Sequence, residues 1–166
     1  TKGVSLSPKS FDSSDFSDFF KKSKELGSVV SWSGDWKELN EKDSAPNVVV
    51  KLSKRYDYTP LIIVDLPAKD EEQEFISEVT KFVGENELKY IGIGNEVNFD
   101  NEPVSFESGV LSFNSVYDEI KGKSPETKVF TIFQYEALRG LRGGLFGGEN
   151  NEANAEWNLL NLAEKS

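Results

Sequence analysis

The sequence predicts an α/β fold of about five parallel βα units. Apolar, strand-like runs alternate with amphipathic helix patterns along the whole chain of 166 residues. The run at 61–65 is almost continuously apolar, which is typical of a parallel strand buried on both faces. Polar or aromatic residues follow every run at the same end. Strict alternation of this kind favours a parallel sheet with right-handed crossovers.

The first two units occupy residues 4–56. An apolar run at 4–6 predicts the first strand, and the helix after it is expected to end at Gly27, a residue that suits the left-handed position beyond a helix. A second strand is predicted at 29–32, and Pro46 suits the first turn of the next helix. The buried stripe of the first helix consists of Phe16, Phe19, Phe20 and Leu26.

The other three units follow the same plan. Strands are predicted at 61–65, 90–94 and 129–133. A glycine-rich loop at 140–148 then leads to a last helix. The apolar stripes of the three helices are Phe75, Ile76, Val79, Phe82 and Val83; Phe106, Val110, Phe113, Tyr117 and Ile120; and Trp157, Leu159, Leu160 and Leu162.

Two architectures fit five such units, an open doubly wound sheet and part of a TIM (β/α)8 barrel. A doubly wound fold gathers its functional residues at one switch point, whereas a barrel has them at the end of every strand. Polar or aromatic residues close all five runs here, which favours the barrel. A complete barrel takes about 250 residues. We therefore expect residues 1–166 to form a single, partial barrel domain.

The composition excludes several kinds of chemistry. The chain has 19 Lys and Arg against 29 Asp and Glu, a net charge of −10, so binding to nucleic acid or to anionic membranes is not expected. Cysteine and histidine are absent, which removes thiol catalysis, Ser–His pairs and the usual zinc sites. We expect no cofactor and no metal, and acid–base chemistry must fall to carboxylates, lysine or tyrosine.

The segment 90–98 is the most informative, because Gly94-Asn95-Glu96 closes the fourth strand. It resembles the fourth strand of the clan A glycoside hydrolases, which are retaining (β/α)8 glycosidases. The resemblance implies that Glu96 is the general acid/base and that Asn95 contacts the sugar 2-hydroxyl. The structural alternative is a turn in which Asn95 and Glu96 only cap the next element.

Other strand ends supply candidate substrate-binding residues. Trp32 and Trp36 flank a glycine turn. One interpretation is that their indole faces stack on sugar rings. The other is that Trp32 lies in the core and Trp36 lies under a loop. For Glu136 two interpretations stay open: it lines a substrate cleft at the strand ends, or it pairs with Arg139 or Arg142. The full set of candidates for substrate binding is Asn95, Trp32, Trp36, Asp35, Asn98, Gln134, Tyr135 and Glu136.

The resemblance implies a glycoside hydrolase acting on β-linked polysaccharide, and it also implies that something is missing. In that family the nucleophile is a glutamate at the end of the seventh strand. This chain provides five predicted strands, so the strand that would carry the nucleophile is not among them. Asp35, Asp65 or Glu136 are the other carboxylates at strand ends, but no family pattern supports them. We expect a second chain or a further segment to complete the barrel.

Two other functions are compatible with the sequence. One is a non-catalytic carbohydrate-binding module on the same scaffold, and the other is a flavodoxin-like open α/β domain for a small ligand or a protein. An open sheet with helices on both faces would indicate the latter. A glycan substrate favours an extracellular or cell-surface location.

Overall fold

The computed structural model describes residues 2–5, 13–98, 106–140 and 155–163. Five parallel strands form one sheet in the order β1-β2-β3-β4-β5, so every strand pairs with its neighbour in sequence. The strands are β1 (Gly3–Ser5), β2 (Val29–Gly34), β3 (Thr59–Val64), β4 (Tyr90–Ile93) and β5 (Lys128–Phe130).

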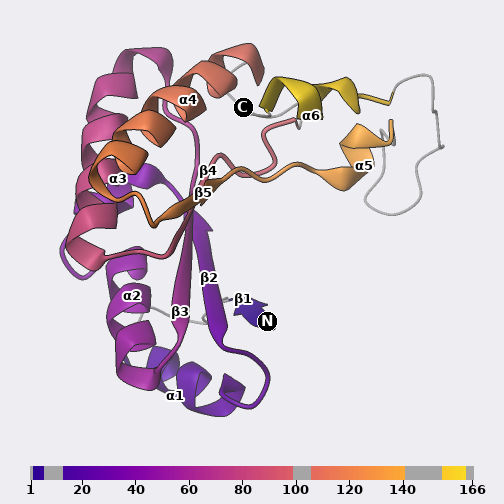
Figure 1. Ribbon diagram of the computed structural model, residues 1–166. Coiled ribbons are helices and arrows are strands. Elements are labelled where there is room, and N and C mark those ends of the chain that lie inside the picture. Colours follow the sequence, from indigo (N-terminus) through magenta and orange to yellow (C-terminus); the bar gives the residue numbers. More distant parts are fainter. Residues whose placement is uncertain (1, 6–12, 99–105, 141–154, 164–166) are drawn as a thin grey trace.

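Helices connect the strands and cover one face of the sheet (Figure 1). None of the described helices is long and apolar enough to cross a membrane. The α-helices are α1 (Ser13–Ser23), α2 (Ala45–Tyr56), α3 (Glu72–Asn86), α4 (Phe106–Lys123), α5 (Tyr135–Leu138) and α6 (Asn158–Ala163), and the 3-10 helices are η1 (Trp36–Asn40) and η2 (Lys69–Glu71).

The prediction of a partial barrel is confirmed by this arrangement. A doubly wound sheet reverses its strand order at a switch point and carries helices on both faces. Here the strand order follows the sequence, and α1 to α4 all lie on one side (Figure 1). The flavodoxin-like alternative is therefore excluded by the topology.

The core lies between the sheet and α1 to α4. Alternate residues of the strands point to this side, as the period of two along a strand requires. Val30 of β2, Ile62 and Val64 of β3 and Ile91 and Ile93 of β4 are completely buried there. Burying each such side chain contributes about 1.5–3 kcal/mol, so this face accounts for much of the stability of the sheet.

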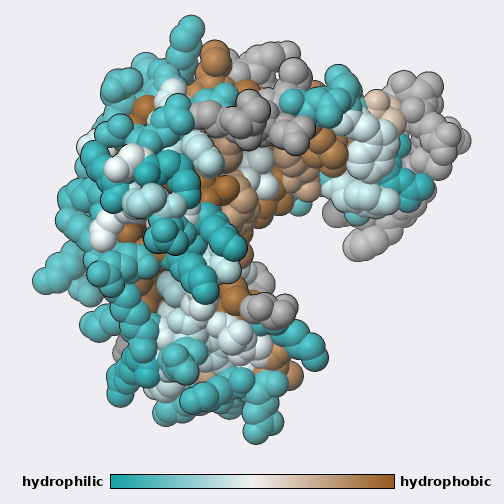
Figure 2. Space-filling view, in the orientation of Figure 1, coloured by the Kyte–Doolittle hydropathy of each residue, from teal (hydrophilic) through white to brown (hydrophobic). Residues whose placement is uncertain are grey.

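None of the helices α1 to α4 covers the opposite face of the sheet (Figure 1). One row across it is Ser33, Ile63, Gly92 and Phe130, which are neighbours in the strand register. A Cβ on Gly92 would meet side-chain atoms of Ile63 at 2.9 Å and of Phe130 at 3.0 Å, so both side chains lean over the glycine. Figure 2 shows the molecule hollowed on this side, with apolar surface along the hollow.

Two predicted boundaries are wrong. The first helix ends at Ser23 rather than before Gly27, which leaves Leu26 in the following turn with 63% of its surface exposed. The last strand ends at Phe130 rather than at residue 133.

The C-terminal part also differs from the sequence prediction. Gln134 is followed by the short helix α5, which the sequence pattern did not predict. Trp157 precedes α6 instead of lying within it. Most of the glycine-rich loop, residues 141–148, lies outside the described residues.

Candidate functional site

The Gly94-Asn95-Glu96 segment forms a tight loop at the carboxyl end of β4. Gly94 has a φ of +83°, a conformation that side chains rarely adopt. A Cβ on Gly94 would also lie 2.3 Å from the Val97 Cγ1 atom, so Val97 folds back over the glycine. Both observations require glycine at this position, and the loop turns sharply because of it.

Glu96 lies exposed in this loop with a φ of +54°. A non-glycine residue in the left-handed region is uncommon, and such strain concentrates at functional sites. Three other residues have similar φ values, Asp43, Asp57 and Glu87. Asp57 and Glu87 cap the ends of α2 and α3, where the left-handed conformation is ordinary, and Asp43 lies in the turn before α2. Glu96 does not end a helix, since the segment before it is β4 and its loop.

The loop is fastened to the segment after β5 by hydrogen bonds on both sides of Glu96. The Ile132 N–H donates to the Gly94 carbonyl at 3.3 Å, and the Val97 N–H donates to the Ile132 carbonyl at 3.0 Å. Asn98 is buried, and its side-chain amide makes two further bonds to the backbone of Gln134. Asn98 and Gln134 therefore join the ends of β4 and β5.

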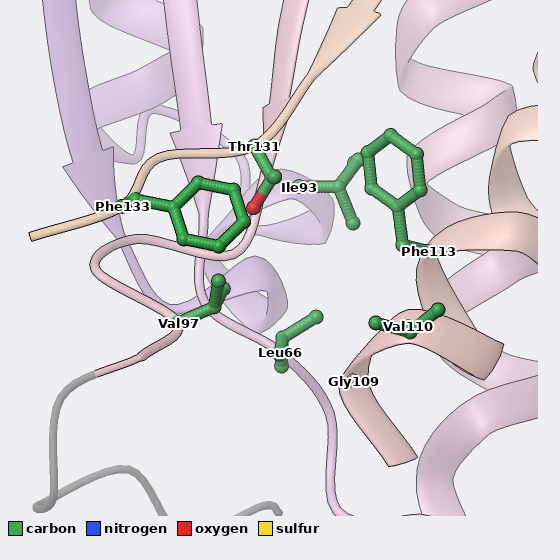
Figure 3. Close-up of a pocket in the computed structure, with 8 residues that line it drawn as sticks. All are labelled: Leu66, Ile93, Val97, Gly109, Val110, Phe113, Thr131 and Phe133. Atoms are coloured by element: carbon green, nitrogen blue, oxygen red, sulfur yellow. The ribbon is translucent and has the colours of Figure 1, made fainter. Parts of the chain in front are cut away.

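A small apolar cavity of about 20 Å³ lies beneath this loop (Figure 3). It is room for about one water molecule, so no sugar ring fits inside. Among the described residues that line it, Thr131 has the only polar side chain, and its hydroxyl is 3.4 Å from the Gly94 carbonyl. The cavity is therefore a packing void between the sheet and α4. It is lined by Leu66, Ile93, Val97, Gly109, Val110, Phe113, Thr131 and Phe133.

Three carboxylates gather at the ends of β2 and β3. Burial raises the pKa of Asp65, and the charge of Asp35 raises it further. Burial also raises the pKa of Glu38, with added repulsion from Glu41, Asp35 and Asp65. Asp35 has a structural role as well, because its carboxylate accepts the Lys37 N–H at 2.9 Å as the cap of η1. Among the described residues, no group of three or more acidic side chains has the geometry to hold a metal ion.

The two tryptophans of the second strand end are in the core. Trp32 is 9% exposed and Trp36 is 3% exposed. The Trp36 ring packs edge-on against Phe75 of α3, with the ring centroids 5.6 Å apart. This burial is the structural alternative that the sequence left open, and it leaves neither indole a free face for a sugar.

The residues after β5 lie at the surface. Tyr135 is 56% exposed and Glu136 is also exposed. The Arg139 guanidinium lies over the Tyr135 ring, with its Cζ atom 5.7 Å from the ring centroid. The other predicted partner of Glu136, Arg142, lies outside the described residues.

Comparison with known proteins adds to the fold and not to the chemistry. No protein-family model and no curated protein sequence matches the chain. Among solved structures, the chain is similar to D-psicose 3-epimerase crystallised in the presence of D-fructose. The TM-score is 0.50 and the sequence identity is 16%, over 78% of this chain and 51% of the epimerase chain. The chain thus spans about half the length of the structure it resembles, and at this identity the likeness concerns the fold alone.

The structure brings the predicted site residues into two groups along one edge of the sheet. Asp35 and Asp65 lie at the ends of β2 and β3, and the Asp65 N–H donates to the Gly34 carbonyl between them. Asn95 and Glu96 lie in the β4 loop that Asn98 ties to Gln134.

Trp157 was not among the candidates for the site. Its place in the sequence pattern predicted a residue of the apolar stripe of the last helix, but in the structure it is 47% exposed and lies beside Tyr135. An apolar residue next to a helical pattern is ordinarily a core residue, so the pattern gave no sign of this position.

Proposed function

We propose that this chain forms the first five βα units of a glycoside hydrolase barrel, in which Glu96 is the general acid/base. The observation that supports the proposal is the conformation of Glu96. It is an exposed carboxylate at the end of the fourth strand, in a left-handed backbone conformation that no helix end requires. Hydrogen bonds on both sides hold that conformation in place.

The proposed reaction uses the Glu96 carboxyl group as a proton donor. In a retaining mechanism it protonates the glycosidic oxygen as the bond from that oxygen to the anomeric carbon breaks, and a second carboxylate attacks that carbon. Glu96 then takes a proton from the water that hydrolyses the glycosyl-enzyme. Asn95, directly before it, is proposed to contact the sugar 2-hydroxyl.

The second carboxylate is proposed to come from strands that complete the barrel. A (β/α)8 barrel needs eight strands, and five are described here, so three more units would close it. In the described sheet β1 and β5 are the edge strands, and α1 to α4 leave the face with Ile63 and Phe130 uncovered. Both features support this, because unpaired edges and apolar surface invite another segment. We propose that the strands come from a second chain or a further segment.

Hydrolysis of β-linked glucan, mannan and xylan by the complete protein tests the proposal. Glu96→Gln should lower the rate by about 10²–10⁴-fold, the contribution of a general acid, while binding of the glycan persists. Glu87→Gln is the matched control, since Glu87 is also exposed, with a φ of +51°, but lies at the end of α3. Cleavage by Glu96→Gln at the wild-type rate would exclude the proposed role.

The structural similarity to the epimerase is compatible with a second function, the binding of a carbohydrate without its cleavage. D-psicose 3-epimerase is named for a sugar substrate and has a barrel that is similar to this chain. If the complete protein binds glycans and turns none of them over, the binding module is the better description.

A further inference from the structure

Most large apolar side chains of the described residues are buried, and two of the exceptions are aromatic rings in contact. The rings of Tyr135 and Trp157 lie edge to face, with centroids 6.1 Å apart and planes at 64°. Together they form an exposed corner with two aromatic walls, which we call the aromatic corner. The exposed large apolar residues are Leu26, Leu111, Tyr135, Trp157 and Leu160.

Backbone hydrogen bonds fix the two walls of the aromatic corner relative to each other. The Glu156 N–H donates to the Leu138 carbonyl at 2.9 Å, which joins the residue before Trp157 to the end of α5. The Arg139 N–H donates to the Tyr135 carbonyl at 3.0 Å, and its guanidinium covers one side of the Tyr135 ring. Rigid aromatic side chains bind with little loss of conformational entropy.

The aromatic corner lies on the same edge of the sheet as the Glu96 loop. Tyr135 directly follows Gln134, whose backbone is bonded to the Asn98 amide, and Asn98 is two residues from Glu96. Figure 1 shows α5 and α6 together beyond the carboxyl end of β5. From this placement we infer that Tyr135 and Trp157 bind a neutral pyranose ring of the glycan, at a position next to the point of cleavage.

The chemistry of the corner fits a sugar better than the other planar or apolar ligands. A pyranose ring has C–H faces that pack on aromatic rings and hydroxyl groups around its edge. Arg139 lies over the Tyr135 ring and offers a donor to such hydroxyls, and Glu136, the next residue in the chain, is exposed and offers an acceptor. Nucleobases also stack on aromatic rings, but the net charge of −10 repels their phosphates.

The inference rests on the proposed function for its ligand class, and Trp157 provides a direct probe. Trp32, Trp36 and Trp157 are the three tryptophans of the chain, and the first two are buried. Quenching of tryptophan fluorescence by acrylamide therefore reports on Trp157. We expect cellopentaose, laminaripentaose or mannopentaose to shift the emission of the chain to the blue and to protect it from acrylamide.

Variants separate this site from other exposed surfaces. Trp157→Phe removes the fluorescent reporter, so its affinity is measured by titration calorimetry and should be kept in part. Tyr135→Ala should weaken binding by about tenfold or more, the scale of one lost stacking contact. Leu111→Ala is the matched control, because Leu111 is 68% exposed on α4. This variant should bind the sugar as the wild type does.

The outcomes distinguish this inference from the proposed function. Protection of Trp157 in Glu96→Gln, without cleavage, supports both. Protection by sugar in a complete protein that cleaves no glycan supports the aromatic corner alone. Normal cleavage by Trp157→Ala with an unchanged KM overturns the aromatic corner and leaves Glu96 standing. Protection of Trp157 that depends on protein concentration and not on sugar also overturns it, since the corner would then be a protein contact.

Discussion

The side-chain amide of Asn98 makes hydrogen bonds to both the N–H and the carbonyl of Gln134. Its Nδ2 donates to the Gln134 carbonyl at 3.1 Å, and its Oδ1 accepts the Gln134 N–H at 2.7 Å. Through this pair, the loop that carries Glu96 and the segment that begins with Tyr135 are held as one unit. Asn98 was predicted to contact substrate, and in the structure its buried amide is bonded to the backbone of Gln134.

Replacing Asn98 should therefore destabilise the fold. Asn98→Ala leaves the Gln134 N–H without its partner, a loss of about 1–3 kcal/mol. The Gln134 carbonyl keeps a donor, because it also accepts the Leu138 N–H at 3.2 Å. We expect the urea midpoint to fall accordingly. Gln134→Ala is the control, because the bonds use only the backbone of Gln134, and it should change stability by less than about 0.5 kcal/mol.

The conformation of Glu96 predicts that this residue costs stability. Its φ of +54° is strained for glutamate and unstrained for glycine, so Glu96→Gly should stabilise the fold by about 1 kcal/mol relative to Glu96→Ala. Thermal unfolding of the two variants measures the difference. Equal melting temperatures would show that the left-handed conformation carries no strain here.

The sequence predicted the order of the elements and most helix faces, because both follow from hydrophobic periodicity. It did not separate the two possibilities for Trp32 and Trp36, since an indole suits either a core or a sugar platform. Nor did it identify the role of Asn98, whose partner is 36 residues away and is a backbone group. Long-range contacts of this kind leave no local pattern.

Gly92 predicts a steric test of the uncovered face of the sheet. Gly92→Ala would bring its Cβ within 2.9 Å of Ile63 and 3.0 Å of Phe130, and overpacking of this kind costs about 1–3 kcal/mol. Gly84→Ala on α3 meets no atom within 4 Å and should stabilise the helix by about 0.5–1 kcal/mol. Denaturant unfolding of both variants gives opposite signs if the packing is as described.

The acidic group at the ends of β2 and β3 predicts a pH dependence of stability. The pKa of Asp65 is raised by burial and by Asp35, so the folded state keeps its proton to a higher pH than the unfolded state does. Stability therefore falls as the pH rises from the ordinary pKa values of the unfolded state, 3.8 for aspartate and 4.5 for glutamate, to the raised pKa values of the folded state. Asp65→Asn should flatten the decline, and Glu38→Gln should flatten it further. Urea midpoints between about pH 4 and pH 7 test this, and an unchanged slope in Asp65→Asn would contradict it.

The edge of β5 predicts how completion of the barrel would be detected. The N–H groups of Lys128 and Ile132 donate to carbonyls of Lys89 and Gly94 on the β4 side. In a parallel ladder, alternate residues donate to opposite sides, so the N–H groups of Val129 and Thr131 point to the open edge. In the 166-residue chain these two amides should exchange with solvent about tenfold or more faster than those of Lys128 and Ile132, because no described strand pairs with this edge of β5. Addition of the strands that complete the barrel should slow Val129 and Thr131 and leave Lys128 and Ile132 nearly unchanged. Equal protection of all four amides in the monomeric chain would mean that the β5 edge is already covered, and the need for further strands would fall with it.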